Sequence, residues 1–311
     1  MTLDIITKIF SSVTIVILNP SNWQLSNMPN SSITINIHLL ISAFLISNVF
    51  ASYGQQMNLT IVNENNQPIP YVNLYFEKSS YGTLSDINGL AQIDVSLLDK
   101  SDTLNLTCIG YENKALELSE LQNNSPEQIH LTSKSYALQD VEIIAEQARF
   151  ISKNVGFNTA LDLCQTGFSN KKKTRGRERA VLIKNNSEAY IESINFNSTS
   201  VSHDSVVYEV NIYEYDHGIG PIINNHRIFV TLKPSDNSKT YSLDLSKMRL
   251  FTRSDFLISF EAVEVFGSGG VMFKCPCHKK TSIYEKSTDG NWTISRERPP
   301  AIWCKLKISK N

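Results

Sequence analysis

The sequence predicts an all-β protein built from two β-sandwiches, and three observations support this fold class. Short runs of alternating apolar and polar residues recur from residue 57 to residue 308, at the roughly 8–12-residue spacing of sandwich strands. Clusters of Asn, Asp, Gly, Pro and Ser separate these runs, as expected of turns. No stretch of useful length shows the 3.6-residue period of an amphipathic helix. Short strands at this spacing are typical of antiparallel sandwiches.

The first 51 residues carry almost no charge, which distinguishes them from the rest of the chain. They contain one acid, Asp4, and one base, Lys8, whereas the whole chain has 30 acidic and 29 basic residues. Their apolar run at 37–49 has about 13 residues, fewer than the roughly 20 of a transmembrane helix. Such a run, followed by the small residue Ala51, is typical of a secretory signal peptide.

We therefore expect an exported protein. Residues 28–51 are predicted to be its signal peptide, and residues 1–27 an over-extended start upstream of Met28. An uncleaved membrane anchor is the alternative. The expected location is the periplasm, the outer membrane or the cell surface, with membrane contact only through the export signal or such an anchor.

The charge balance excludes some classes of partner. A formal net charge of -1 lacks the basic field by which proteins attract nucleic acid, so no nucleic-acid partner is expected. Six bases gather in residues 171–179, without the interleaved aromatic residues of a nucleic-acid patch. We interpret them as a solvated turn entering a strand, with contact to anionic lipid headgroups or lipopolysaccharide as the alternative.

The first domain is predicted to span residues 57–140. Alternation predicts its strands at 58–62, 71–76, 81–85, 90–95, 103–109 and 128–131. Asn88-Gly89 accepts positive φ and marks a tight turn. Asp86 and Asn88 could belong to a calcium loop, but its twelfth position is Leu97 rather than the required Glu. A turn whose side chains bind local amides is therefore favoured.

Three segments of this domain resemble the carboxypeptidase regulatory-like module. They are Gln67-Pro68-Ile69-Pro70-Tyr71-Val72-Asn73, then Gly82-Thr83 with Ser85-Asp86 and Asn88-Gly89, and lastly Ile109-Gly110-Tyr111. The resemblance implies a transthyretin-like, seven-stranded β-sandwich, common in exported proteins of Bacteroidetes-type bacteria. It implies no peptidase activity here, because no His-Glu-x-x-His occurs and no histidine is followed by Glu at the third position.

Residues 141–175 are predicted to be a linker, and residues 176–311 a second, jelly-roll-like antiparallel β-sandwich. Its strands are predicted at 180–183, 189–196, 205–215, 226–232, 240–245, 256–266, 270–275, 281–285, 292–295 and 302–308. This part resembles an uncharacterised domain that often follows the carboxypeptidase regulatory-like module, and the resemblance implies no activity. The segments that carry it are Gly176-Arg177-Glu178, Ile212-Tyr213 with Pro221, Leu243-Asp244-Leu245-Ser246 and Phe256-Leu257-Ile258-Ser259-Phe260-Glu261.

Cys275, Cys277 and His278 form the most reactive-looking cluster and are the candidate metal ligands. They could bind zinc or copper if Cys164, Cys304 or another histidine completed four ligands. The proline between the two cysteines stiffens the bend and does not help both sulfurs face one ion. A disulfide from one of them to Cys304 or Cys164 is favoured in an oxidising compartment.

The chain has 5 cysteines, so at least one cannot pair within it. Cys108 lies on the apolar face of its predicted strand, and we expect it to be a free, buried thiol.

Several aromatic side chains of the second sandwich could form a platform for stacking sugars. Their alternation along the strands places most of them in the core instead. They are Tyr208, Tyr213, Tyr215, Phe256, Phe260, Trp292 and Trp303.

These observations predict an exported, non-catalytic cell-envelope protein that acts as a binding or scaffolding module for a protein or a glycan. No catalytic residue and no cofactor are expected. The alternative is a glycan-active or metal-dependent enzyme on the second sandwich. It would need a metal site of His and Cys, or two acids that face each other across a cleft.

Overall fold

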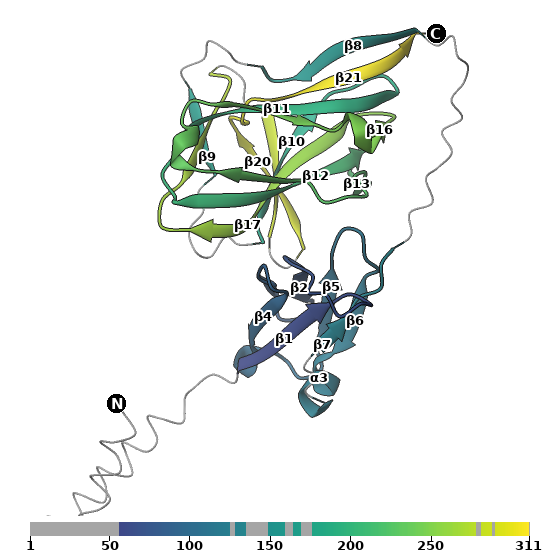
Figure 1. Cartoon of the computed structure of the whole chain (residues 1–311), viewed down its shortest axis with the longest axis vertical. Coiled ribbons are helices and arrows are strands. Elements are labelled where there is room, and N and C mark those ends of the chain that lie inside the picture. Colours follow the sequence, from purple (N-terminus) through teal and green to yellow (C-terminus); the bar gives the residue numbers. More distant parts are fainter. Residues whose placement is uncertain are drawn as a thin grey trace, which may run out of the picture. The chain divides into compact units, whose positions relative to one another are not determined.

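The computed structural model describes residues 56–124, 128–134, 149–158, 164–168, 176–277, 281–287 and 290–310 (Figure 1). Strands in antiparallel sheets dominate these residues, so the predicted all-β fold class is confirmed. The predicted signal peptide and the residues before it lie outside the described ranges. Within those ranges, no helix is long and apolar enough to cross a membrane. The described residues belong to one compact unit.

The first sandwich contains a three-stranded sheet of order β4-β1-β7 and a four-stranded sheet of order β3-β2-β5-β6. Each predicted strand has a counterpart, whereas β6 and the short helix α3 (Leu118–Asn124) were not predicted. Side chains from both sheets fill the space between them, with Phe76 and Leu104 fully buried. The strands are β1 (Gln56–Val62), β2 (Asn73–Phe76), β3 (Tyr81–Leu84), β4 (Leu90–Asp94), β5 (Thr103–Thr107), β6 (Lys114–Glu117) and β7 (Gln128–His130).

The turn before β4 has the predicted geometry. Gly89 has a φ of 74°, and a Cβ atom there would lie 2.5 Å from the carbonyl oxygen of Ile61. Oδ1 of Asp86 accepts hydrogen bonds from the backbone amides of Asn88 and Leu90, at 2.8 and 2.9 Å. The Asp86 carboxylate therefore accepts hydrogen bonds from local backbone amides, as predicted for a turn.

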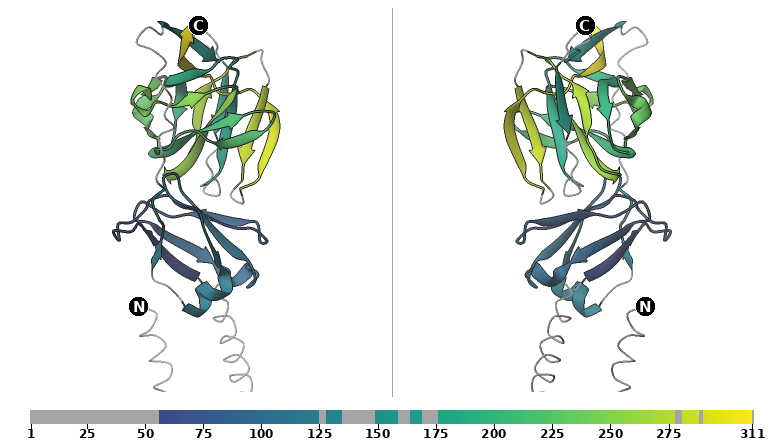
Figure 2. Two further views of the ribbon diagram at one scale, coloured as in Figure 1. Left: turned by 90° about the vertical axis from the view of Figure 1, so that its right-hand side faces the viewer. Right: turned by 90° about the vertical axis from the view of Figure 1, so that its left-hand side faces the viewer.

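The second sandwich has two seven-stranded sheets (Figure 2). The β17 sheet has the order β13-β12-β17-β10-β19-β20, with β14 also on β12, and the β11 sheet has the order β8-β21-β11-β18-β9, with β15 and β16 also on β11. Its strands are β8 (Arg149–Gly156), β9 (Gln165–Phe168), β10 (Glu178–Ile183), β11 (Ala189–Val201), β12 (Ser205–Tyr215), β13 (Ile219–Ile222), β14 (Phe229–Leu232), β15 (Thr240–Asp244), β16 (Phe251–Thr252), β17 (Phe256–Phe266), β18 (Val271–Lys274), β19 (Thr281–Lys286), β20 (Trp292–Glu297) and β21 (Ile302–Lys310).

The segment predicted as a linker contributes two of these strands. β8 pairs with β21 from Arg149 to Gly156, and β9 pairs with β18. The prediction that residues 141–175 form a linker is therefore wrong for residues 149–156 and 165–168, which belong to the β11 sheet.

The predicted basic cluster is described only at its C-terminal end, since residues 171–175 lie outside the described ranges. Arg179 enters β10 and forms ion pairs with Glu285 at 2.9 Å and with Glu297 at 2.7 Å. Acidic residues of the neighbouring strands thus compensate this arginine.

Aromatic rings form the centre of the core between the two sheets. Phe196 of β11 stacks on Tyr241 at a centroid distance of 4.8 Å and meets Phe260 edge-on at 5.1 Å. Tyr208 and Phe256 are also buried in this core. The prediction that most of the seven aromatic residues are core residues is confirmed for Tyr208, Phe256 and Phe260, whereas Tyr215, Trp292 and Trp303 are only partly buried.

His203, in the connection from β11 to β12, gives the first testable prediction. It is 1% exposed, and neither ring nitrogen has a hydrogen-bond partner among the described residues. Because an unpaired buried polar group costs about 1–3 kcal/mol, we expect His203→Leu to stabilise the fold by about 1 kcal/mol. Urea unfolding of both proteins measures the change. A clear loss of stability would instead mean that the imidazole makes a favourable interaction.

Candidate functional site

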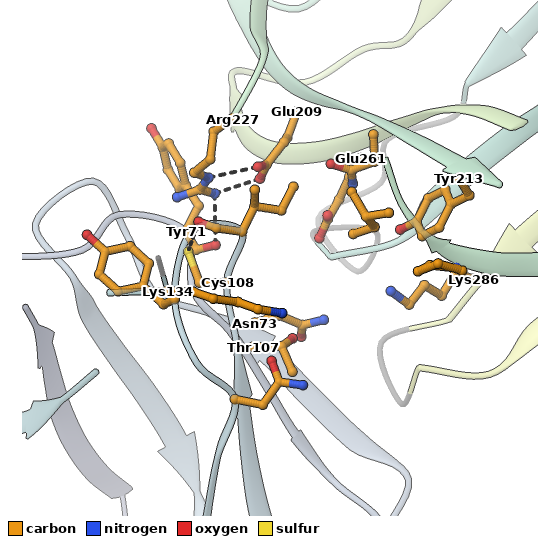
Figure 3. Close-up of a pocket in the computed structure, with 16 residues that line it drawn as sticks. Tyr71, Asn73, Thr107, Cys108, Lys134, Glu209, Tyr213, Arg227, Glu261 and Lys286 are labelled. Atoms are coloured by element: carbon orange, nitrogen blue, oxygen red, sulfur yellow. Dashed lines mark hydrogen bonds and ion pairs between the residues drawn. The ribbon is translucent and has the colours of Figure 1, made fainter. Parts of the chain in front are cut away.

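A row of charged side chains crosses the outer face of the β17 sheet. In the sheet register, Glu209 of β12 is opposite Glu261 of β17, Glu261 is opposite Glu178 of β10, and Glu178 is opposite Lys286 of β19. Directly opposite residues share one face of a sheet, with Cβ atoms roughly 4.5–5.5 Å apart. Their sequence neighbours Tyr208 and Phe260 face the core. We call Glu209, Glu261, Glu178 and Lys286 the acidic row; Glu209, Glu261 and Lys286 are labelled in Figure 3.

Glu178 is the most enclosed member of the row, with 1% of its surface exposed. The hydroxyl of Tyr213 donates to its carboxylate at 2.9 Å, and Nδ2 of Asn211 donates at 2.8 Å. The hydroxyl of Ser259 donates as well, and Nζ of Lys286 lies 3.6 Å away. Burial and the nearby Glu178 carboxylate raise the pKa of Tyr213 well above its usual value. Tyr213 therefore remains a protonated donor that stabilises the charge of Glu178.

Glu209 is neutralised by a bidentate ion pair. Nε of Arg227 donates to one carboxylate oxygen at 2.7 Å, and Nη2 donates to the other at 2.6 Å. The same guanidinium donates to the backbone carbonyl oxygens of Pro70 and Tyr71 and lies 4.8 Å from the ring centroid of Phe229. Two planar groups matched in this way form a strong and directional contact.

Glu261 lies between these two satisfied carboxylates and differs from both. It is 9% exposed, and its carboxyl group has no hydrogen bond or ion pair within the described part of the chain. Burial raises its pKa to about 8, and the adjacent Glu178 and Glu209 add to the shift against the opposing effect of Lys286 and Arg227. Glu261 is therefore a protonated, neutral acid at neutral pH.

A cavity of about 380 Å³ opens over the acidic row (Figure 3). Glu209, Glu261, Lys286 and Tyr213 line it, together with Asn73 of β2, Thr107 at the end of β5 and Cys108 after it. This volume lies within the range of small-molecule sites. Most of the lining groups are polar, so the cavity suits a polar ligand rather than a hydrophobic one.

Cys108 is a free cysteine, as predicted, but its surroundings differ from those predicted. It follows the end of β5, is only half-buried and lines the cavity. Burial raises the pKa of its thiol to about 12. Cys108 thus stays a thiol at neutral pH and lacks the thiolate character of a reactive nucleophile.

The structure separates the candidate metal ligands. Cys277 forms a disulfide with Cys164 across a Cα–Cα distance of 5.2 Å, one of the predicted pairings. Cys275 and Cys304 are buried and form no disulfide bond with a described residue, and His278 lies outside the described residues. The sulfur of Cys277 is therefore committed to a covalent bond. Within the described ranges, no group of three or more His, Cys, Asp or Glu residues could hold a metal ion.

Three aromatic residues of the predicted sugar platform lie near the acidic row rather than in the core. Tyr213 and Trp292 meet edge-on at a centroid distance of 5.4 Å, and Tyr215 packs against the same outer cluster. Nζ of Lys286 lies 6.0 Å from the ring centroid of Tyr213 and 5.8 Å from that of Trp292. Trp303 is in β21, at a partly exposed position of the other sheet.

The acidic row was not predicted from the sequence, although two signals pointed to it. Glu178, Ser259 and Glu261 lie in the segments that carry the second resemblance, and so does Tyr213. In addition, Glu209 interrupts a run of apolar residues in the middle of β12. An acid at the centre of an apolar strand needs a partner or a function, because burial of a charge is costly.

The raised pKa of Glu261 predicts that stability depends on pH. The folded protein keeps this proton up to about pH 8, whereas the carboxyl group of an unfolded chain loses it near 4.5. The folded state therefore binds more protons in this window, and stability falls as pH rises through it, by at most about 1.4 kcal/mol per pH unit. We expect Glu261→Gln, an uncharged isostere, to remove this part of the decline. Urea unfolding of both proteins between about pH 5 and 8 tests this prediction. If the free energy of unfolding has the same pH dependence in both proteins, the prediction is wrong.

No family model matches this chain, and no curated protein matches it. Among solved structures, it is similar to the cysteine protease and lectin-like domains of a surface layer associated protein of Clostridium difficile, with a TM-score of 0.30, 12% identity and coverage of 48% of this chain and 37% of that one. The major pilin subunit of Bacillus cereus gives a TM-score of 0.17, 10% identity and coverage of 79% and 68%. The structure of the infectious bursal disease virus Gx strain gives a TM-score of 0.21 and 8% identity, with coverage of 82% of this chain and 63% of that one. Likenesses at these TM-scores carry no argument about function.

Proposed function

We propose that this protein is an exported, non-catalytic module of the cell envelope that binds a glycan in the cavity over the acidic row. The observation that carries the proposal is the polar cavity of about 380 Å³. Its floor is a fixed line of carboxyl and ammonium groups on one sheet. Strands hold these groups rigidly, which lowers the cost of ordering a site when a ligand binds.

The lining suits the hydroxyl groups of a sugar, each of which can both donate and accept. Nδ2 of Asn211 donates a hydrogen bond to Glu178. Oδ1 of Asn211 has no hydrogen-bond partner among the described residues. Asn73 and Thr107 add further polar groups from the first sandwich. Tyr213 supplies an aromatic ring in the cavity wall, and aromatic rings with one polar end are suited to sites that are partly apolar.

The setting in the cell envelope rests on two features of the sequence. The apolar run at 37–49 followed by Ala51 supports export. The resemblance of the first domain to the carboxypeptidase regulatory-like module supports the same setting, and its three-stranded and four-stranded sheets agree with the seven strands of that module. The disulfide between Cys164 and Cys277 also favours an oxidising compartment.

A glycan array with the labelled full chain tests the proposal, followed by calorimetry on each glycan that binds. We expect a defined subset of glycans to bind. Asn73→Ala, which removes a cavity amide, should weaken their affinity by about tenfold. The control Lys247→Ala changes an exposed residue next to β15 and should leave affinity unchanged. A folded protein that binds no glycan would overturn the proposal.

One observation favours the enzyme alternative, namely that Glu261 has a raised pKa and lies beside Glu178. Glycosidases pair a protonated acid with a carboxylate in this way. Here the acids lie side by side on one sheet rather than on opposite walls of a cleft, and Glu178 is enclosed by its own donors. We therefore expect no release of the aryl group from aryl glycosides. Release by the natural protein that Glu261→Gln abolishes would establish the enzyme instead.

A further inference from the structure

We propose that the ligand of this cavity is an amino sugar whose free, protonated amino group binds Glu261, an inference that rests on the proposed glycan binding.

The charges around Glu261 leave room for one more cation. The charged groups that act on Glu261 are Glu209 on β12, Glu178 on β10, Lys286 on β19 and Arg227 before β14. Lys134 and the hydroxyl-bearing Tyr213 also line the cavity. Glu209 is paired with Arg227, and Glu178 has Lys286 nearby. The charges of these two acids and two bases cancel while Glu261 is protonated. Loss of its proton leaves one uncompensated negative charge in a buried place, which an ammonium group of the ligand would neutralise.

The hydrogen-bond inventory points to the same ligand group. Oδ1 of Asn211 is buried and has no hydrogen-bond partner among the described residues. The Glu261 carboxyl group forms no hydrogen bond or ion pair with any of them either. Both residues line the cavity, and Glu261 is nine-tenths buried. Asn211 is opposite Ser259, two residues from Glu261 on the same face of β17. Once Glu261 has lost its proton, the site therefore holds two neighbouring acceptors without a donor, whereas an ammonium group has three donors and no acceptor.

The binding step is balanced in charge and protons. The ligand enters as R–NH₃⁺, the Glu261 carboxyl group gives its proton to water or buffer, and a carboxylate–ammonium pair forms with no covalent change. One proton is therefore released for each ligand bound while the pH lies below the pKa of the free site. In that range the affinity should rise up to about tenfold for each pH unit.

Calorimetry on the full chain with glucosamine, N-acetylglucosamine and glucose tests this inference, because these sugars differ only at the second carbon. At about pH 6.5 we expect glucosamine to bind at least about tenfold more tightly than the other two. Titrations in two buffers of different ionisation enthalpy should show the release of one proton. Glu261→Gln should lose both the preference and the proton release. The control Glu188→Gln, at an exposed acid between β10 and β11, should keep both.

The outcomes separate this inference from the proposed function. Equal affinity for glucose and glucosamine, without proton release, would overturn the amino-sugar inference and leave glycan binding in place. Cadaverine, a diamine without a sugar ring, is the remaining probe. If it binds as tightly as glucosamine while both neutral sugars fail, Glu261 binds ammonium groups in general, and the glycan proposal falls together with the amino-sugar inference. If no probe binds to the natural protein, the inference is wrong. Proton release is measured on that protein, so the test does not depend on the folding of Glu261→Gln.

Discussion

Replacing Cys164 and Cys277 together with serine is expected to lower the free energy of unfolding by about 3–5 kcal/mol. The disulfide joins residues separated by 113 positions. In the chain-entropy description, a crosslink that closes a loop of about 100 residues contributes up to about 4.7 kcal/mol, because it restricts the unfolded chain. It also fastens β9, whose first residue follows Cys164, to the end of β18.

Guanidinium unfolding of the full chain measures this loss. The oxidised natural protein is compared with the double variant and with the natural protein in reducing agent, and the last two should agree. Cys108→Ser is the matched control, because it removes a free thiol that forms no disulfide. Should the double variant unfold at the same denaturant concentration as the natural protein, the crosslink would contribute nothing to stability.

Arg227→Met is expected to destabilise the protein by about 3–5 kcal/mol. The side chains of Arg227 and Glu209 are 14% and 6% exposed. Removal of the guanidinium leaves a buried carboxylate without its counter-ion, and broken buried pairs cost this much. Three further hydrogen bonds or ring contacts of Arg227, to Pro70, Tyr71 and Phe229, are lost as well.

A double-mutant cycle separates the energy of the Arg227–Glu209 ion pair from that of the other contacts of Arg227. Replacing both partners with methionine should cost less than Arg227→Met alone, because no buried charge then remains unpaired. Thermal and urea unfolding of the four proteins give the coupling energy. If the double variant is less stable than Arg227→Met by the full cost of Glu209→Met, the two residues act independently and the ion-pair argument fails.

Much of the fold could be predicted because long strands that turn every second side chain into the main core show a period of two in the sequence. The predicted runs at 205–215 and 256–266 coincide with β12 and β17. These strands bury alternate side chains such as Tyr208, Val210 and Phe260 in the core. A period of two is a strong signal over 11 residues.

The strands that were missed carry little such signal. β8 contains Arg, Ser, Lys and Asn among its apolar residues, and of its described side chains only Val155 is buried. β8 forms a strand because it pairs with the long edge of β21. This pairing is a tertiary contact, which the sequence of β8 alone does not reveal. β6 has four residues and no buried position.

The acidic row could not be predicted from single strands for a different reason. Each acid is visible in the sequence, but their alignment depends on three separate registers, between β12, β17, β10 and β19. A shift of one residue in any of them would turn a side chain to the opposite face. The β-bulge between Val207 and Tyr208 sets part of that register and leaves no recognisable mark in the sequence.

The pairing of β11 also determines where the backbone of the second sandwich opens. β11 spans 13 residues and is hydrogen-bonded to β21, β18, β15 and β16. Its amide hydrogens can therefore exchange with deuterium only when several strands separate together, close to global unfolding. β8 has a single partner strand and mostly exposed side chains, so its amides exchange through local fraying. We therefore expect amides at the centre of the β11 sheet to exchange slowly and those at its β8 edge to exchange fast.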